Sequence, residues 1–453
     1  MTFPCYPKYK DSGVEWLGDV PEQWTLSRGD AYISSISKLV SAESLNDKEI
    51  FHYSIPVVQA SGDGQLEDGS EIDSSKLLVQ RRQVLISKLN PRKNTVCLAR
   101  PHDALTVCSG EFVPLQSDTL NHKWLYYLVG SENFRKRLES LVESATRSHQ
   151  RVNPSDILKF QGAFPSLLEQ TQIARFLDHE TARIDALIKE QKRLIGLLKE
   201  KRQAVISHAV TKGLDPTVPT KDSGVEWLGA VPAHWDVVPT NYRYEIQLGR
   251  MLNEQRAQGD HLKPYLRVFD VQWNAINTTD LPLMDFPPEA QSMYRLKSGD
   301  LMVNEGGSYV GRSAIWRGDL DECYYQKALH RLRPRDLKRD TAEFFLHVME
   351  MATQQGVFVA GGNQTTIDHL TAEQLRQYRF AFPPLEEQVH IAEKITAVVS
   401  KIQNTTSKAE ELIGYLQERR SALISAAVTG KIDVRGWQPP VRSQSPELAQ
   451  EVV

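Results

Sequence analysis

The chain has 453 residues, of which 40% are hydrophobic and 25% are charged, and its formal net charge at pH 7 is −3. This length is sufficient for two or three domains with cores of their own. The slightly acidic balance argues against a protein that binds nucleic acid over its whole surface, but it leaves room for a local basic patch.

The cysteines and the apolar segments indicate the cellular setting. The four cysteines form no CxxC pair and no Cys/His cluster with metal-ligand spacing, so free thiols in a reducing cytosol are expected. The first residues, MTFPCYPKYKDSG, contain no apolar core of a signal peptide. No stretch is apolar over the length that a bilayer requires. We expect a cytoplasmic protein that has no metal site and does not contact a membrane.

The chain opens with a segment, residues 1–25, that is repeated near its middle. KDSGVEWLG occupies residues 10–18 and again residues 221–229. Downstream, FPSLLEQTQIA from Phe164 matches FPPLEEQVHIA from Phe382, and the region 200–211 matches 418–429 at eight positions. The blocks between these matches show no visible similarity. A duplicated frame with different contents predicts two halves related by a pseudo-two-fold axis.

The first variable block, residues 26–163, has the pattern of an α/β domain. Short β-rich runs at 84–87 and 111–114 precede a predicted helix at 123–142 and a polar loop from Thr146. The stretch 76–100 carries seven Lys and Arg residues and no acidic residue. Such cations could anchor phosphates, and Arg, Asn and Gln could read base edges; a plain solvated surface is the alternative.

The segment 164–212 and its repeat 382–430 each predict one long helix. Apolar residues recur with the spacing of a coiled-coil seam, at steps of three, four or seven, with Gln191, Lys201, Thr405 and Arg419 as polar members of the pattern. The seam positions are Leu177, Ile184, Leu187, Leu194, Leu198 and Val205 in the first helix and Ile391, Ile395, Val398, Ile402, Ala409, Leu412, Leu416 and Leu423 in the second. We expect the two helices to pack antiparallel on each other; separate core helices are the alternative.

The second half repeats this order with the frame segment 213–235, a variable block at 236–381 and a tail at 431–453 that we expect to be flexible. The block has β-rich runs at 301–304 and 329–332 and a predicted helix at 341–353. The candidate DNA-contacting residues are Arg81, Arg82, Lys88, Asn90, Arg92, Lys93, Arg147, His149, Gln150 and Arg151 in the first block, and Asn304, Ser308, Tyr309, Arg312, Arg331, Arg333, Gln364 and Thr365 in the second.

No catalytic constellation is visible in the sequence. NPSD at Asn153 resembles the NPPY-type motif of amino-methyltransferases, but Asp156 replaces the aromatic residue that would stack on a flipped base. GGSYVG at Gly306 lacks the GK(S/T) of a phosphate loop. We therefore assign no catalytic residue and no bound cofactor to this chain.

The frame closely resembles the specificity subunits of type I restriction-modification enzymes. The resemblance rests on YKDSGVEWLGDVPEQW from Tyr9, on the FP-x-L-x-EQ-x-x-IA start of each long helix, and on AVISHAVTKG from Ala204, in this order and duplicated. It implies an α/β fold with two target-recognition domains separated by an antiparallel coiled coil. Each domain would read one half of an asymmetric split site in double-stranded DNA, and the helices would set the spacing.

The resemblance also implies the partners. Two modification subunits would carry S-adenosylmethionine and methylate adenine, and restriction subunits would use ATP and Mg²⁺ to translocate and cut DNA, as expected in phage defence. The specificity subunit would not be catalytic. The alternatives are a stand-alone DNA methyltransferase or nuclease, and a coiled-coil scaffold without a nucleic-acid role.

Overall fold

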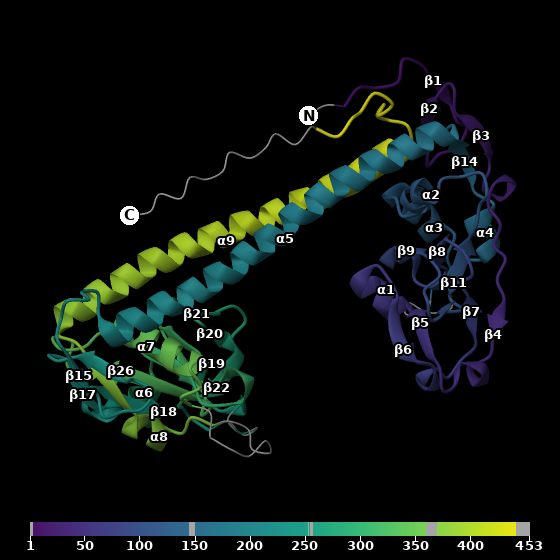
Figure 1. Cartoon of the computed structure of the whole chain (residues 1–453). Helices are drawn as coiled ribbons and strands as arrows, with labels where there is room; N and C mark the ends of the chain where they lie inside the picture. Colours follow the sequence, from purple (N-terminus) through teal and green to yellow (C-terminus); the bar gives the residue numbers. More distant parts are fainter. Residues whose placement is uncertain (1–2, 145–149, 252, 254–256, 359–368, 441–453) are drawn as a thin grey trace. The chain divides into compact units, whose positions relative to one another are not determined.

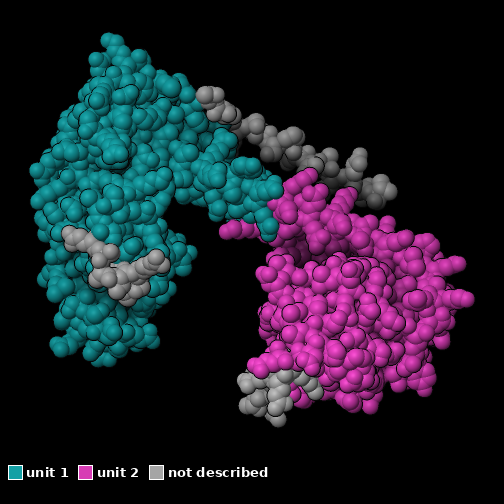
Figure 2. Space-filling model, turned by 180° about the vertical axis from the view of Figure 1, so that it is seen from behind, with its two compact units in different colours: residues 1–191, 410–453 teal, residues 192–409 magenta. Residues whose placement is uncertain are grey.

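The computed structural model describes residues 3–144, 150–251, 253, 257–358 and 369–440. The chain divides into two units: unit 1 comprises residues 1–191 and 410–453, and unit 2 comprises residues 192–409 (Figure 2). Two long helices, α5 (Leu167–Lys212) and α9 (Leu385–Val428), each begin in one unit and end in the other (Figure 1). Their bounds lie within three residues of those that the sequence predicts.

Unit 1 contains two sheets that carry the first variable block. The three-stranded sheet has the order β11-β8-β9, and the five-stranded sheet has the order β4-β7-β10-β5-β6. The short elements are β1 (Tyr9–Asp11), β2 (Asp19–Pro21), β3 (Thr25–Arg28), β4 (Leu39–Val40), β5 (Glu49–Tyr53), α1 (Ile55–Ser61), β6 (Gln65–Asp68), β7 (Lys76–Leu78), β8 (Gln83–Ser87), β9 (Val96–Ala99), β10 (Leu105–Cys108), β11 (Phe112–Leu115), α2 (His122–Val129), α3 (Glu132–Ser140), β12 (Glu143–Ser144), β13 (Gln150–Arg151), α4 (Pro154–Leu158) and β14 (Gln161–Phe164).

Unit 2 has a corresponding architecture. A four-stranded sheet has the order β18-β26-β23-β24, and a three-stranded sheet has the order β22-β19-β25. The elements are β15 (Thr220–Asp222), β16 (Ala230–Pro232), β17 (Asp236–Pro239), β18 (Tyr244–Leu248), β19 (Leu262–Leu266), β20 (Val271–Gln272), β21 (Ala275–Ile276), β22 (Leu283–Asp285), α6 (Pro288–Tyr294), β23 (Leu301–Asn304), β24 (Ser313–Ile315), β25 (Tyr324–Tyr325), β26 (Leu329–Pro334), α7 (Ala342–Gln354), α8 (Ala372–Gln377) and β27 (Arg379–Phe382).

The repeated frame residues make the same contacts in both units. Gln170 accepts a hydrogen bond from Asn121 N at 2.8 Å and donates to Pro165 O at 2.9 Å. Gln388 accepts from Thr341 N at 3.0 Å and donates to Pro383 O at 2.9 Å. Each glutamine therefore joins the start of a long helix to the N-cap of the helix packed beside it, since Asn121 caps α2 and Thr341 caps α7.

The predicted helix at 123–142 is in fact two helices, α2 and α3. Gly130 ends α2, and the side chain of Ser131 accepts a hydrogen bond from Phe134 N at the start of α3. A Gly–Ser pair offers both a helix stop and an N-cap, so the break has a local cause.

The long helices pack antiparallel. In unit 1, the first part of α5 contributes Ile184 to a core that contains Leu423 and Ile424 from the end of α9. Asp185 pairs there with Arg420 at 2.9 Å. In unit 2, the end of α5 contributes Ile206 to a core with Ile391 and Ile395 from the start of α9, so each helix start meets the other helix's end.

The predicted seam is partly wrong. Leu187 and Leu194 are 45% and 38% exposed, whereas the neighbouring Ile188 and Ile195 are half-buried. On α9, Leu412 is 42% exposed, whereas the neighbouring Ile413 is half-buried. Both members of each adjacent apolar pair suit a coiled coil, and the packing of the whole helix selects one of them.

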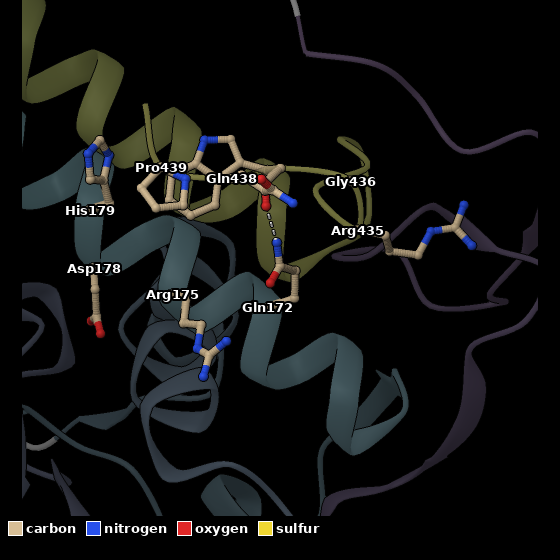
Figure 3. Close-up of a pocket in the computed structure, with 9 residues that line it drawn as sticks. Gln172, Arg175, Asp178, His179, Arg435, Gly436, Gln438 and Pro439 are labelled. Atoms are coloured by element: carbon tan, nitrogen blue, oxygen red, sulfur yellow. Dashed lines mark hydrogen bonds between the residues drawn. The ribbon is translucent and has the colours of Figure 1, made fainter. Parts of the chain in front are cut away.

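The expectation of a flexible tail is wrong for residues 431–440. Val434 is 1% exposed, and Trp437 packs edge-on against Phe176 with ring centroids 5.3 Å apart. Gln172 on α5 donates hydrogen bonds to Val434 O and Trp437 O at 3.1 and 2.5 Å. This packing creates a cavity of about 800 Å³ lined by α5 and residues 435–439 (Figure 3). Residues 441–453 lie outside the described part of the chain.

The two variable blocks share a core that the sequence does not reveal. One cluster in unit 1 and one in unit 2 place apolar residues at corresponding points of the chain, five pairs on corresponding strands and one pair on α1 and β20. The pairs are Tyr53 and Leu266, Val58 and Val271, Leu85 and Met302, Cys97 and Ala314, Cys108 and Tyr325, and Phe112 and Leu329. A core needs apolar volume rather than particular residues, so the two blocks share a fold although their sequences differ.

Candidate nucleic-acid interface

The loop after β8 and the loop after β23 correspond residue by residue. Ser87 N donates to Thr95 O at 2.9 Å, and Asn304 N donates to Arg312 O at 2.9 Å, so each loop is closed at its base in the same way. Their first left-handed residues are Asn90, with φ 50°, and Gly307, with φ 69°. The second are Asn94, with φ 46°, and Gly311, with φ 75°. Asn and Gly are the residues that tolerate this conformation best.

A second segment from far along the chain lies against each loop. In unit 1, Asn90 N donates to Gln150 O at 2.7 Å, and Val152 N donates to Lys88 O at 3.0 Å. In unit 2, Leu370 N donates to Glu305 O at 2.6 Å, and Gly306 forms a β-bridge with His369. In unit 1 the structure thus joins the loop after β8 to the end of the polar loop that begins at Thr146, and in unit 2 it joins the loop after β23 to residues 369 and 370.

The unit 1 loop carries exposed cations. Arg92 and Lys93 are exposed on a short 3-10 helix, Pro91–Lys93. Lys88 donates to Gly110 O at 2.9 Å, and Arg151 pairs with Glu111 at 2.9 Å. The Arg151 guanidinium lowers the pKa of the Glu111 carboxyl. Of the predicted residues, this loop cluster contains Lys88, Asn90, Arg92, Lys93, Gln150 and Arg151.

Arg81 and Arg82 are placed apart from that cluster along the sheet. Both precede β8, whereas the loop follows it. Arg81 hydrogen-bonds Gln116 and pairs with Asp118 at 3.0 Å. Burial, reinforced by the nearby charge of Arg82, lowers the pKa of His122. The structure does not bring these two arginines to the loop.

The unit 2 loop presents different chemistry on the same backbone. Ser308 is exposed, and the guanidinium of Arg312 stacks over the Tyr309 ring at 4.6 Å from its centroid. Arg312 Nη1 also donates to Gln272 Oε1. Glu305 stands where unit 1 has Lys88, so this loop has one cation beside a carboxylate.

Three predicted residues of unit 2 serve the fold instead. Asn304 is fully buried and donates to Val268 O and Val271 O, both at 3.1 Å. Arg331 is 2% exposed and donates to Glu245 at 2.6 Å. Arg333 forms a two-bond ion pair with Asp300 at 2.6 and 2.7 Å. Both arginines lie on β26, an inner strand of the sheet, where only a paired cation is tolerated.

Four predicted residues lie outside the described residues: Arg147 and His149 in the first block, and Gln364 and Thr365 in the second. The sequence analysis also missed two glutamines that hold the loops. Gln59 donates to Thr95 Oγ1 at 2.8 Å, and Gln272 accepts from Arg312. A usable signal for the loops was the shared spacing of Asn90 with Asn94 and of Gly307 with Gly311.

Two features of the described residues bear on metal binding and on thiol chemistry. These residues contain no group of three or more His, Cys, Asp or Glu side chains that could hold a metal ion. Cys97, Cys108 and Cys323 are buried, and burial raises the pKa of the Cys108 thiol to about 12. A thiol held this firmly protonated is a poor nucleophile. In the part of the chain that the structure describes, no helix is long and apolar enough to cross a membrane.

Comparison with known proteins agrees with the repeated frame. The family model described as "Type I restriction modification DNA specificity domain" matches residues 245–413. The chain is 19% identical to the type I restriction enzyme EcoKI specificity subunit of Escherichia coli K12, over 95% of this chain and 93% of that protein. It is 21% identical to the putative MjaX specificity subunit of Methanocaldococcus jannaschii, over 92% and 96%.

Solved structures share the fold. A chain from a structure on complex assembly of the type I R-M system aligns with a TM-score of 0.68 at 17% identity, over 91% of this chain and 99% of that chain. The HsdS subunit from Thermoanaerobacter tengcongensis aligns with a TM-score of 0.58 at 16% identity, over 91% and 98%. Taken together, the duplicated frame, the domain matched at residues 245–413 and the similarity over more than nine-tenths of the chain support a specificity subunit of the type I restriction-modification family.

Proposed function

We propose that this chain recognises DNA for a type I restriction-modification complex, and that each unit reads one half of a split site through the loop after β8 or after β23. The observation that carries the proposal is the matched backbone of these two loops combined with their different side chains. Because the two loops have matching backbones, both units can approach DNA in the same manner. Different side chains let them select different bases.

The chain itself is non-catalytic in this proposal. Methylation belongs to modification subunits that bind S-adenosylmethionine, and cleavage belongs to restriction subunits that use ATP and Mg²⁺. The purified chain alone should neither methylate nor cut DNA that carries the site. Methylation or cleavage of such DNA by the isolated chain, in a preparation free of modification and restriction subunits, would contradict this assignment.

Two modification subunits are proposed to dock on the outer apolar faces of the long helices. Unit 1 exposes Leu187, Leu412 and Tyr415, and unit 2 exposes Leu194 and Leu197, with exposed fractions between 38% and 70%. Large apolar side chains left outside a coiled-coil seam suit a protein partner. Native mass measurement of the co-expressed complex should give two modification subunits per chain, and one or none would count against the proposal.

The long helices are proposed to set the spacing between the half-sites. α5 has 46 residues and α9 has 44, and at roughly 1.5 Å per residue each is a rod of about 65–70 Å. Inserting four residues within 190–198 should lengthen the non-specific spacer by about one or two base pairs. An unchanged spacer at full activity would show that the helices do not set it.

The central test is an exchange of one block. Replacing residues 26–163 with the corresponding block of a related specificity subunit should change one half of the methylated site and leave the other half intact. Methylated adenines are mapped in a host that carries the whole system. A change in both halves would mean that the units do not read DNA separately.

A further inference from the structure

Both loops are anchored from the side by a glutamine that follows a corresponding strand at the same distance, on α1 in unit 1 and on β20 in unit 2. Gln59 is the sixth residue after β5, and Gln272 is the sixth residue after β19. Each strand pairs in parallel with its counterpart, β10 or β25, so the two strands occupy corresponding places. The glutamines bond the last loop residue, which is Thr95 in unit 1 and Arg312 in unit 2.

The chemistry of this anchor differs between the units. Gln59 Nε2 donates to the hydroxyl of Thr95. Thr95 is 5% exposed, so this hydrogen bond lies inside unit 1. Gln272 Oε1 instead accepts from Arg312 Nη1, and its Nε2 donates to Phe269 O at 2.8 Å. The second bond fixes the amide, and the fixed amide in turn orients the guanidinium.

Arg312 is therefore held on two sides. Gln272 accepts a hydrogen bond from Nη1, and the guanidinium carbon lies 4.6 Å from the centroid of the Tyr309 ring. Among the described residues, Nε and Nη2 of Arg312 make no hydrogen bond. These two groups form one planar edge with two parallel donors. An edge of this kind matches the O6 and N7 acceptors of guanine in the major groove.

We infer that Arg312 reads a guanine in the half-site recognised by unit 2, with Gln272 as its positioning residue. The inference rests on the proposed function and adds a base and a residue to it. A phosphate could also accept two bonds. Residues 305–312 carry a single cation, Arg312, whereas the unit 1 loop gathers Lys88, Arg92 and Lys93, so the unit 1 loop is the better phosphate contact of the two.

The first experiment uses the wild-type chain in complex with its modification subunits. The methylated site is mapped, and the half that survives exchange of residues 26–163 is assigned to unit 2. Each guanine of that half is then replaced by 7-deazaguanine, which lacks the N7 acceptor. One position should weaken binding about tenfold or more. A unit 2 half-site with no guanine on either strand, or with no sensitive position, overturns the inference without any variant having to fold.

The second experiment uses Arg312→Lys, which keeps the charge and loses the planar edge. The variant should bind natural and 7-deazaguanine duplexes equally well at the sensitive position, and it should accept other bases there. Gln272→Ala should weaken discrimination at that same position while the melting temperature stays within a degree or two. Arg335→Lys is the matched control: this arginine is exposed in unit 2, bonds Asn241 O and should behave like the wild type.

The outcomes separate this inference from the proposed function. If Arg312→Lys weakens all duplexes alike and Arg312→Ala lowers the salt slope by about one, Arg312 contacts phosphate and the inference is wrong. If the wild-type complex binds its site specifically and the variant keeps the same base preference, the inference also fails while the proposed function stands. If the wild-type complex shows no sequence-specific binding, the proposed function itself fails.

Discussion

Asn90 and Gly307 occupy the same left-handed turn of two loops that share no sequence, with φ values of 50° and 69°. Each lies beside a strand-like segment from elsewhere in its unit, and each is followed four residues later by a second left-handed residue. The duplication of the chain therefore extends through the variable blocks at the level of the backbone. Five expected outcomes follow from the particular contacts of these units.

Gly307→Ala should lower the free energy of unfolding of unit 2 by about 1–2 kcal/mol. No atom lies within 4 Å of a Cβ at this position, so backbone strain is the whole cost. Gly307→Asn should cost less, because Asn tolerates the same turn at position 90. Gly196→Ala, inside α5 and with open space around it, should instead stabilise the chain. Urea unfolding measures all three, and equal losses for Ala and Asn would contradict the argument.

Arg333→Ala should destabilise unit 2 by roughly 3 kcal/mol, because it leaves the Asp300 carboxylate buried without its partner. The Asp300 side chain is 1% exposed, and Arg333 supplies two of its hydrogen bonds. Adding Asp300→Asn should recover part of the loss, which a double-mutant cycle by thermal unfolding would measure. The methylated motif should stay the same at a temperature at which the variant is folded. Loss of base specificity at a position of the motif would instead show that Arg333 contacts DNA.

Arg92→Ala combined with Lys93→Ala should weaken binding to all DNA sequences alike and reduce the salt slope by about two. Both side chains are exposed and lie on the unit 1 loop, which suits contact with phosphate. Lys48→Ala is the control, since Lys48 is exposed between Asp47 and Glu49. Binding is measured over a salt series, and an unchanged affinity and slope would remove this loop from the interface.

Unit 2 should lose stability as the pH falls from about 6.5 toward 4. Burial lowers the pKa of His330 from 6.5 to about 4, and its Nε2 donates to Leu370 O at 2.6 Å. Between these values the unfolded chain binds a proton that the folded chain does not, so stability falls by at most about 1.4 kcal/mol per pH unit. His330→Gln can keep a donor to Leu370 without titrating and should flatten this slope. An unaltered slope would assign the acid sensitivity to other groups.

Trp437→Ala should destabilise unit 1 by roughly 2 kcal/mol, less than for a fully buried tryptophan because Trp437 is only half-buried. Gln172→Ala, which removes the two bonds to Val434 O and Trp437 O, should act in the same direction. Gln438→Ala is the control, because this exposed side chain lies in the same segment. Thermal unfolding measures the shifts, and no change in any variant would mean that residues 431–440 do not support unit 1.

Features of the molecule that depend on a local residue pattern can be predicted from the sequence alone. Heptad spacing located both long helices to within three residues, and the duplicated frame located the two halves and pointed to the family. The frame glutamines, Gln170 and Gln388, recur because each closes the same pair of hydrogen bonds. Such contacts need particular atoms at a fixed spacing, so the residues that make them remain recognisable.

Long-range packing, in contrast, determines which polar residues face outward. In the sequence, Arg331 and Arg333 look like part of a basic patch. Both lie on an inner strand, where Arg331 is buried and pairs with Glu245 and Arg333 pairs with Asp300. Arg312 differs from them through Gln272 and Tyr309, one of which lies 40 residues away. The choice of Ile188 over Leu187 in the seam is also made by packing. Burial and pairing depend on residues distant in sequence, so they leave no pattern in neighbouring residues, and the loops show only Asn or Gly at two positions four residues apart.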